Sequence, residues 1–240
     1  MQKLGTLYLI PVTLGADNIT KVLPPEVVAI AQQLEIFVVE NEKTARHFLS
    51  TIKTNKPVRE LQLNTLNEHT TDQELPGLLK PLLAGNDVGL MSEAGCPGIA
   101  DPGAKLAQLA HQKGIRVSPL VGPSSILMGL MASGLNGQRF TFLGYIPADK
   151  AARIQRLKEI ERISAKNHET QIFIETPYRN QHLFEDILAQ CQSNTRLCIA
   201  CNISFEDEFI VTKTIAEWNK MQKNTLPDLH KKPTVFLILS

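Results

Sequence analysis

The chain has 240 residues, of which 43% are hydrophobic and 20% charged, and this is typical of a globular protein with one large or two small domains. Its formal net charge of +1 excludes a strong overall field for nucleic acid, so any basic surface that binds RNA must be local. No apolar run reaches transmembrane length, residues 1–3 lead directly into a strand pattern without a signal peptide's apolar region, and the four cysteines suit a reduced protein. We therefore expect a cytoplasmic protein that does not enter a membrane.

The first half of the chain alternates short apolar strands with helices. Strands are predicted at residues 4–12, 36–40, 58–63, 87–91 and 115–119, and helices at 24–34, 44–51, 70–83 and 103–113. Asp17 or Asn18 is a candidate helix cap, and Pro81 predicts a kink or a break. This alternation indicates a mostly parallel sheet covered on both faces. A Rossmann nucleotide site is disfavoured and a P-loop is excluded, because neither glycine motif is present.

The second half has a different pattern. Strands are predicted at residues 140–145, 171–175, 196–203, 208–214 and 234–239, with helices at 126–132, 149–163, 183–188 and 215–221. Consecutive strands without an intervening helix indicate a mixed or antiparallel sheet. We place the domain boundary near residue 120, which gives an N-terminal α/β domain at 1–120 and a C-terminal α/β domain with a mixed sheet at 121–240.

Two loops rich in small residues follow strands of the first half. Residues 91–103 hold three glycines and two prolines, and residues 120–125 read Leu-Val-Gly-Pro-Ser-Ser. Glycines let a ligand approach the backbone, and ligands of open α/β sheets bind at the carboxyl ends of strands. The second loop runs into a helix, whose N-terminus suits a polar or anionic group. Tight turns and serine capping are the alternative interpretation of the two loops.

Two further patterns have a functional and a structural interpretation. The helix at 149–163 carries Lys150, Arg153, Arg156, Lys158 and Arg162, which could grip phosphates, but a solvated helix face is the favoured interpretation. Cys198 and Cys201 have the spacing of a redox or metal pair, but they lie in a predicted buried strand without a second cysteine pair. We expect core cysteines there and no metal site in the protein.

Four segments form an ordered set along the chain, at residues 7–15, residues 92–97 with 101–103, residues 121–124 and residues 174–179. Together they resemble the tetrapyrrole methylase superfamily of S-adenosylmethionine-dependent methyltransferases. Within that superfamily they are most similar to the ribosomal small-subunit RNA ribose methyltransferase I group. That group has a Ser-Asp-Ala-Gly-Thr-Pro loop, an Asp-Pro-Gly, a Gly-Pro loop and a Tyr-Glu-Ser/Thr-x-x-Arg segment at these places. Each segment is weak evidence alone, whereas the ordered set is specific.

The resemblance implies a fold, a cofactor and a partner. It implies two α/β domains, S-adenosylmethionine folded into the cleft between them, a homodimer, and 2′-O-methylation of RNA in the small ribosomal subunit. The family's cofactor loops map onto Pro11, Thr13, Leu14, Ser92, Glu93, Gly95, Pro97, Gly122, Pro123, Ser124 and Ser125. Glu175 and Tyr178 would lie near the same cleft.

The chain also departs from the pattern of this group. After the second strand the group has Ala-Glu-Asp-Thr-Arg, and the chain has residues 39–43, in which Glu40 keeps the acid, Asn41 replaces the Asp, and the Thr-Arg is lost. At residues 200–205 the group's Ala-Arg-Glu-Leu-Thr-Lys becomes Ala-Cys-Asn-Ile-Ser-Phe, and in the 92–97 loop Asp becomes Glu93. The cofactor site is therefore retained and the acceptor site altered.

Methyl transfer from a sulfonium depends mainly on alignment, and a ribose hydroxyl must also lose its proton. Glu40 is the candidate base or orienting acid, and a charge at a helix N-terminus is its alternative interpretation. Glu68 and His69 form a weaker candidate pair. Three functions stay open: a ribosomal RNA methyltransferase, a methyltransferase of a tetrapyrrole or another small molecule, and a non-catalytic protein that keeps the cofactor.

Overall fold

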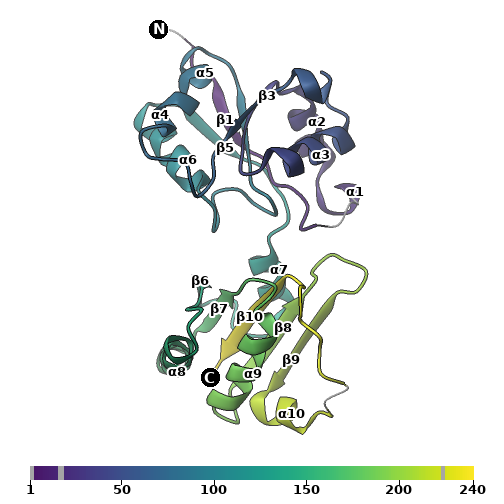
Figure 1. Cartoon of the computed structure of the whole chain (residues 1–240), viewed down its shortest axis with the longest axis vertical. Helices are drawn as coiled ribbons and strands as arrows, with labels where there is room; N and C mark the ends of the chain where they lie inside the picture. The colour runs from purple at the N-terminus through teal and green to yellow at the C-terminus, as the bar shows by residue number, and fades with distance from the viewer. Residues whose placement is uncertain (1–2, 16–18, 223–224) are drawn as a thin grey trace. The chain divides into compact units, whose positions relative to one another are not determined.

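The computed structural model describes residues 3–15, 19–222 and 225–240. The chain divides into two compact units, Met1–Ser124 and Ser125–Ser240 (Figure 1). The domain bounds at residue 120 stay a prediction. The predicted class is confirmed, since a parallel sheet forms the first unit and a mixed sheet the second. The predicted cap at Asp17 or Asn18 lies outside the described residues. Within the described ranges, no helix is long and apolar enough to span a bilayer.

The first unit is built on a parallel sheet of five strands in the order β3-β2-β4-β1-β5. The strands are β1 (Thr6–Leu9), β2 (Ile36–Val39), β3 (Gln62–Thr65), β4 (Val88–Met91) and β5 (Arg116–Pro119). Every residue of β4 is buried, which is why this segment reads as a continuous apolar run.

Helices cover both faces of this sheet, as the alternating pattern predicts. They are α1 (Ile19–Val22), α2 (Pro25–Gln33), α3 (Glu42–Ile52), the 3-10 helix η1 (Val58–Glu60), α4 (Leu75–Leu78), α5 (Lys80–Leu83) and α6 (Gly103–Gln112). One core contains Phe37 with apolar residues of α2 and α3, and the other contains Leu90 with those of α4, α5 and α6. Figure 1 shows these two groups of helices on opposite sides of the strands.

Two predicted elements of the first unit differ from the structure. The strand expected at 58–63 is wrong in its first half, because a 3-10 turn closes from the Glu60 N–H to the Pro57 carbonyl at 2.8 Å, and β3 begins only at Gln62. The helix expected at 70–83 is two short helices that begin at Leu75 and Lys80. The break predicted from Pro81 is confirmed, since a proline lies in the first turn of α5 and cannot continue the hydrogen bonds of α4.

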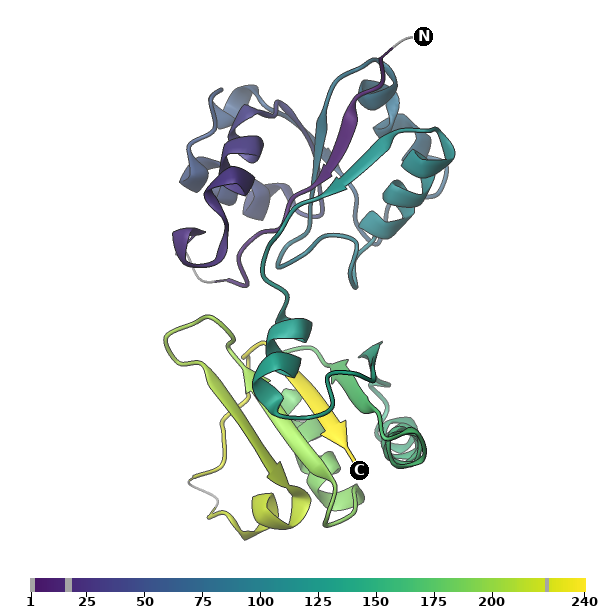
Figure 2. The ribbon, with the colours of Figure 1, turned by 180° about the vertical axis from the view of Figure 1, so that it is seen from behind.

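The second unit holds a mixed sheet in the order β6-β7-β10-β8-β9, in which only β6 and β7 pair in parallel. The strands are β6 (Phe140–Tyr145), β7 (Thr170–Ile174), β8 (Arg196–Cys201), β9 (Phe209–Thr214) and β10 (Thr234–Leu239). One face packs against α8 (Lys150–Asn167), α9 (Asn180–Gln190) and α10 (Ile215–Lys220) around Trp218 and Phe236. The other face carries α7 (Ser125–Ser133), which is in front of the sheet in Figure 2.

The two free cysteines of β8 are core residues, as predicted. Cys198 and Cys201 are 0% and 2% exposed, and only Cys201 belongs to the core cluster that the three helices cover. Burial raises the pKa of Cys198 to about 11, so its thiol stays protonated and unreactive at neutral pH. Across the described residues, no group of three or more His, Cys, Asp or Glu side chains could hold a metal ion.

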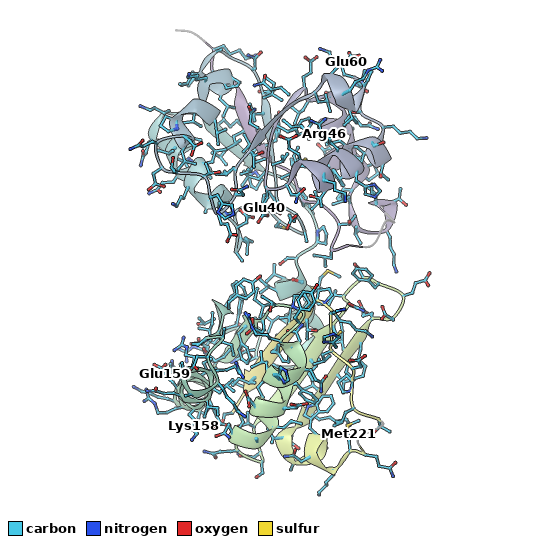
Figure 3. The ribbon with its side chains drawn as sticks, in the orientation of Figure 1. Glu40, Arg46, Glu60, Lys158, Glu159 and Met221 are labelled. Atoms are coloured by element: carbon cyan, nitrogen blue, oxygen red, sulfur yellow. The ribbon has the colours of Figure 1, made fainter. Side chains whose placement is uncertain are left out.

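The expected solvated face of α8 is wrong for Arg153. Its side chain is 7% exposed, and its Nε and terminal nitrogen donate to one oxygen of Asp186 on α9 at 2.8 and 2.7 Å. The same helix carries Lys158 and Glu159 on its outer side (Figure 3). The basic residues of α8 therefore do not share one face, and Arg153 joins two helices in the core.

The Arg153–Asp186 pair yields a stability prediction. Asp186→Ala leaves a buried guanidinium without its partner and should lower the free energy of unfolding by roughly 3–5 kcal/mol. Glu159→Ala is the matched control, because it removes the exposed partner of Arg156 and should cost less than about 1 kcal/mol. Urea denaturation followed by circular dichroism measures both. Equal losses in the two variants would show that the buried pair has no special role.

Candidate functional site

The parallel sheet has a switch point between β1 and β4. The connection from β1 leads to β2 on one side, and the connection from β4 leads to β5 on the other side. Loops that leave neighbouring strands in opposite directions open a crevice at the carboxyl ends, where ligands of this architecture bind. The residues after β1 and β4 are those singled out in the sequence.

The loops after β1 and β4 are joined through their backbones. The Val12 N–H donates to the Gly95 carbonyl at 2.9 Å, and the Gly95 N–H donates to the Thr13 carbonyl at 3.4 Å. Gly95 has a φ of +71°, and a Cβ there would lie 3.3 Å from both Leu14 Cδ2 and the Pro123 oxygen. The backbone conformation therefore favours glycine at this position, and a side chain would also be tightly packed.

The third loop, Gly122 to Ser124, joins the same group. The Cys96 thiol lies 3.3 Å from the Pro123 carbonyl oxygen, and a Cβ on Gly122 would come within 2.2 Å of the Pro11 ring. The three loops that the sequence predicted as cofactor loops thus meet within the first unit. Their predicted members Ser92, Glu93, Pro97 and Ser124 belong to the same unit, whereas Ser125 is the first residue of α7 in the second.

Asp101 holds the later part of the long loop. Its two carboxylate oxygens accept the N–H groups of Gly98 at 2.8 Å and Gly103 at 2.6 Å. Burial raises the pKa of Asp101, and these backbone N–H groups partly offset the effect. The loop is therefore fixed by its own carboxylate up to the start of α6.

Glu40 follows the last residue of β2 and contacts the loop after β4 (Figure 3). Its backbone N–H donates to the Met91 carbonyl at 3.2 Å, and its Oε2 accepts the Glu93 N–H at 3.1 Å. Burial raises the pKa of Glu40. The Glu93 N–H lowers it, and the charges of Glu93, Asp101 and Glu68 raise it further. A carboxylate with a raised pKa beside a ligand loop is a candidate base.

The residue that caps α3 is Asn41, and the alternative interpretation of Glu40 as a charge near the N-terminus of this helix stays a prediction. The Asn41 side chain accepts the N–H groups of Lys43 at 2.9 Å and Thr44 at 3.3 Å. Asparagine caps a helix as well as aspartate does, so the departure at residue 41 removes a charge and keeps the start of α3. Glu40 remains available to the loop after β4.

A pocket of about 390 Å³ opens between the loop after β1, the helix α3 and the loop after β4. We call it the α3 pocket. Its lining is Val12, Thr13, Gly15, Ile19, Lys43, Thr44, Ala45, His47, Phe48, Thr51, Met91, Ser92 and Glu93. Of the predicted site residues, Thr13, Ser92 and Glu93 line it. The volume is within the range of small-ligand sites.

Sequence reasoning missed the α3 side of this pocket. Lys43, Thr44, His47, Phe48 and Thr51 recur at helical spacing, and this spacing was the signal that could have grouped them. Lys43 also occupies the position of the arginine in the Ala-Glu-Asp-Thr-Arg pattern, so a cation is kept at this wall although the Thr-Arg is lost. The weaker candidates Glu68 and His69 form an exposed ion pair outside the lining.

Glu175 and Tyr178 belong to the second unit. Glu175 Oε1 accepts the Thr176 N–H at 2.6 Å and a guanidinium N–H of Arg179 at 2.7 Å, while Oε2 is buried without a hydrogen-bond partner. Tyr178 is 67% exposed, and Lys231 Nζ lies 5.8 Å from its ring centre. Their roles toward a cofactor stay predictions.

The fold and the site can now be compared with known proteins. The family model of the tetrapyrrole (corrin/porphyrin) methylases matches residues 6–219, and the chain therefore belongs to this family. It is a methyltransferase that uses S-adenosylmethionine as its methyl donor.

Two curated proteins that are similar to this chain have the same name. The chain is 31% identical over 216 residues to the ribosomal RNA small subunit methyltransferase I of Vibrio cholerae, a match that covers 88% of this chain and 69% of the relative. It is 30% identical over 225 residues to the protein of the same name from Escherichia coli O157:H7, with 92% and 74% covered. The crystal structure of the methyltransferase CobJ has the same fold, with a TM-score of 0.64 at 17% identity over 98% of this chain and 94% of that one.

The residues present fit the cofactor. S-adenosylmethionine needs backbone donors and acceptors for its adenine and amino-acid ends, and the three loops supply small residues whose backbones are held close together. These are the observations that would be expected of a cofactor site built mainly from the main chain.

The raised pKa of Glu40 makes stability depend on pH. The folded protein binds more protons than the unfolded chain between the ordinary value of 4.5 and the raised pKa, so the free energy of unfolding falls as the pH rises through this range. Glu40→Gln keeps an oxygen for the Glu93 N–H and does not titrate. We expect it to weaken this fall in urea midpoints measured from about pH 4 to 8.

Glu60→Gln is the control for this measurement, because Glu60 is exposed on η1 (Figure 3). Its pH profile should match that of the wild type. An unchanged profile in the Glu40 variant would contradict the idea that burial of this carboxyl destabilises the ionised form.

The contact of the three loops yields a binding prediction. Gly95→Trp places a side chain where a Cβ is already within 3.3 Å of Leu14 and Pro123, so it should abolish saturable binding of S-adenosylmethionine in a calorimetric titration. Gly137→Trp is the control, because a Cβ at Gly137 meets nothing within 4 Å. Binding that survives Gly95→Trp in a folded protein would place the cofactor away from these loops.

Proposed function

We propose that this protein methylates a ribose 2′-hydroxyl in RNA of the small ribosomal subunit. The observation that carries the proposal is the Glu40 carboxylate, which has a raised pKa and accepts the Glu93 N–H of a cofactor loop. An alcohol acceptor needs such a proton acceptor. The relatives named ribosomal RNA small subunit methyltransferase I support the RNA substrate, because they match 88% and 92% of the chain.

Bound S-adenosylmethionine would supply a methyl group on a positively charged sulfur, and the ribose oxygen would displace that sulfur at the methyl carbon. The Glu40 carboxylate would accept the proton that the hydroxyl loses. The hydrogen bond from the Glu93 N–H fixes the orientation of Glu40 and leaves its Oε1 for the acceptor. Positioning supplies most of the remaining rate.

The other members of the proposed site are the loop residues Pro11, Thr13, Leu14, Ser92, Glu93, Gly95, Pro97, Gly122, Pro123, Ser124 and Ser125. Glu175 stays in this set because one of its buried oxygens has no partner. Tyr178 stays in the set on the resemblance alone. The proposal includes a homodimer in the cytoplasm, where ribosomal RNA is found; the cofactor is S-adenosylmethionine, and no metal takes part.

A small-molecule acceptor is the second candidate, since the family description names corrins and porphyrins and a neighbour in structure is CobJ. The α3 pocket does not favour it. Porphyrin precursors carry several carboxylates, and among the described lining residues Lys43 and His47 are the basic side chains, beside the acidic Glu93.

A protein that binds the cofactor and methylates nothing is the third candidate.

The proposal is tested with small ribosomal subunits from a strain that lacks its own methyltransferase I. The protein and radiolabelled S-adenosylmethionine should label the RNA, and the labelled dinucleotide should resist alkali, because a 2′-O-methyl group blocks cleavage of the adjacent phosphodiester. Glu40→Gln should bind cofactor and RNA with unchanged affinity and lose at least about 100-fold in kcat.

Each outcome discriminates among the three candidates. Label on a tetrapyrrole but not on RNA would support the second candidate. Cofactor binding without transfer to either acceptor would support the third. Full activity of Glu40→Gln would show that Glu40 orients the loop and does not take the proton.

A further inference from the structure

The α3 pocket has the make-up of a site for a flat ring with a polar edge. Val12, Ala45, Phe48 and Met91 are buried and form an apolar floor. Hydroxyls from Thr13, Thr44, Thr51 and Ser92 stand among the lining residues. Heteroaromatic bases bury their faces on apolar side chains and place donors and acceptors at their edges.

The charges of the lining restrict the ligand further. Lys43 supplies one full cation, with its side chain exposed at the first turn of α3, and Glu93 supplies one anion. A single lysine suits one phosphate group and not a set of carboxylates. The backbone N–H groups of that turn are already taken by the Asn41 side chain, so the phosphate contact would come from the Lys43 ammonium.

The pocket is joined to the candidate base. Glu93 is one of the residues that line the pocket, and its backbone N–H donates to the Glu40 carboxylate. The neighbouring residues of the same loop have other contacts, since Gly95 bonds to Val12 and Thr13 and Cys96 lies against Pro123. The part of the loop that holds the other loops together is therefore distinct from the part that faces α3.

Two departures from the ribose methyltransferase group line this pocket, Lys43 on α3 and Glu93 in the loop after β4, whereas those at residues 200–205 lie in the second unit. The cofactor is common to the whole group, so a change in the α3 wall is assigned to the acceptor. Lys43 in place of an arginine keeps the positive charge but loses the planar guanidinium, which can bind a phosphate through two parallel N–H groups.

We propose that the α3 pocket binds the base of one unstacked nucleotide of the acceptor RNA, with Lys43 on an adjacent phosphate. This inference rests on the proposed methylation of RNA and names the subsite that selects the acceptor. The hydroxyls of Thr44, Thr51 and Ser92 donate to the carbonyls of Asn41, His47 and Ala94, so they read the edge of the base by accepting hydrogen bonds from its amino or imino groups. Phe48 with Met91 covers its face. The site is selective for single-stranded or splayed-out RNA, because a paired base cannot enter it.

Two variants test this subsite in the ribosomal-subunit assay. Lys43→Ala should raise the KM for the subunits about tenfold and lower the salt dependence of binding by about one unit in the log–log slope. Thr51→Trp fills the pocket from an exposed position and should raise the KM by more than about tenfold. The Kd for S-adenosylmethionine should stay at the wild-type value in both.

Lys158→Ala is the matched control, since it removes an exposed lysine from α8 of the second unit (Figure 3). It should leave the KM, the salt slope and the cofactor Kd unchanged. Circular dichroism and urea midpoints show whether each variant is folded, and the Lys43→Ala change leaves the capped backbone of α3 intact.

The outcomes separate this inference from the proposed function. If the wild type labels the RNA and both variants keep its KM and salt slope, the subsite assignment is wrong and the function stands. A weakened cofactor Kd in Thr51→Trp would assign the pocket to S-adenosylmethionine and overturn the inference. Failure of the wild type to label RNA, while it binds the cofactor, would overturn both.

Discussion

The site depends on the close approach of three loop backbones at Gly95 and Gly122. A Cβ at Gly122 would come within 2.2 Å of Pro11, and Gly95 is enclosed by Leu14 and Pro123 while its own N–H and carbonyl bond to the first loop. A side chain at Gly122 would overlap the Pro11 ring, and one at Gly95 would be strained by the positive φ as well as tightly packed. The proposed site is therefore built mainly of main-chain groups, and a neighbouring element supplies the carboxylate of Glu40.

The neighbouring element is the turn between β2 and α3. Glu40 leaves the sheet at the end of β2, reaches the Glu93 N–H and is partly withdrawn from water. Asn41 then caps α3 and fixes the direction of the helix whose side chains line the pocket. Residues 40–43 thus hold the proposed base, the cap of α3 and the lysine of the pocket wall. A change in this one short segment would alter the proposed acceptor site without moving the backbone contacts of the glycine loops.

The fold and the loops could be predicted from the sequence for identifiable reasons. Buried strands such as β4 are continuous apolar runs, and loops that need close backbone contacts require glycine and proline. The α3 wall could not be predicted in the same way, because Lys43, Thr44 and Thr51 are polar residues at helical spacing and resemble a solvated face. Arg153 was misjudged for a related reason: its partner Asp186 lies 33 residues away, and only the packing of α8 on α9 brings them together.

The loop after β8 in the second unit is held by contacts among its own residues and Lys232. At residues 200–205 the chain lacks the basic residues of the ribose methyltransferase group. Asn202 and Ser204 adopt left-handed backbone conformations with φ of 50° and 73° there. Asn202 bonds to Asp207, which also pairs with Lys232 at 3.3 Å, and these contacts offset the strain. The loop therefore offers no Lys or Arg at residues 200–205, whereas the wall of the α3 pocket keeps a cation at Lys43.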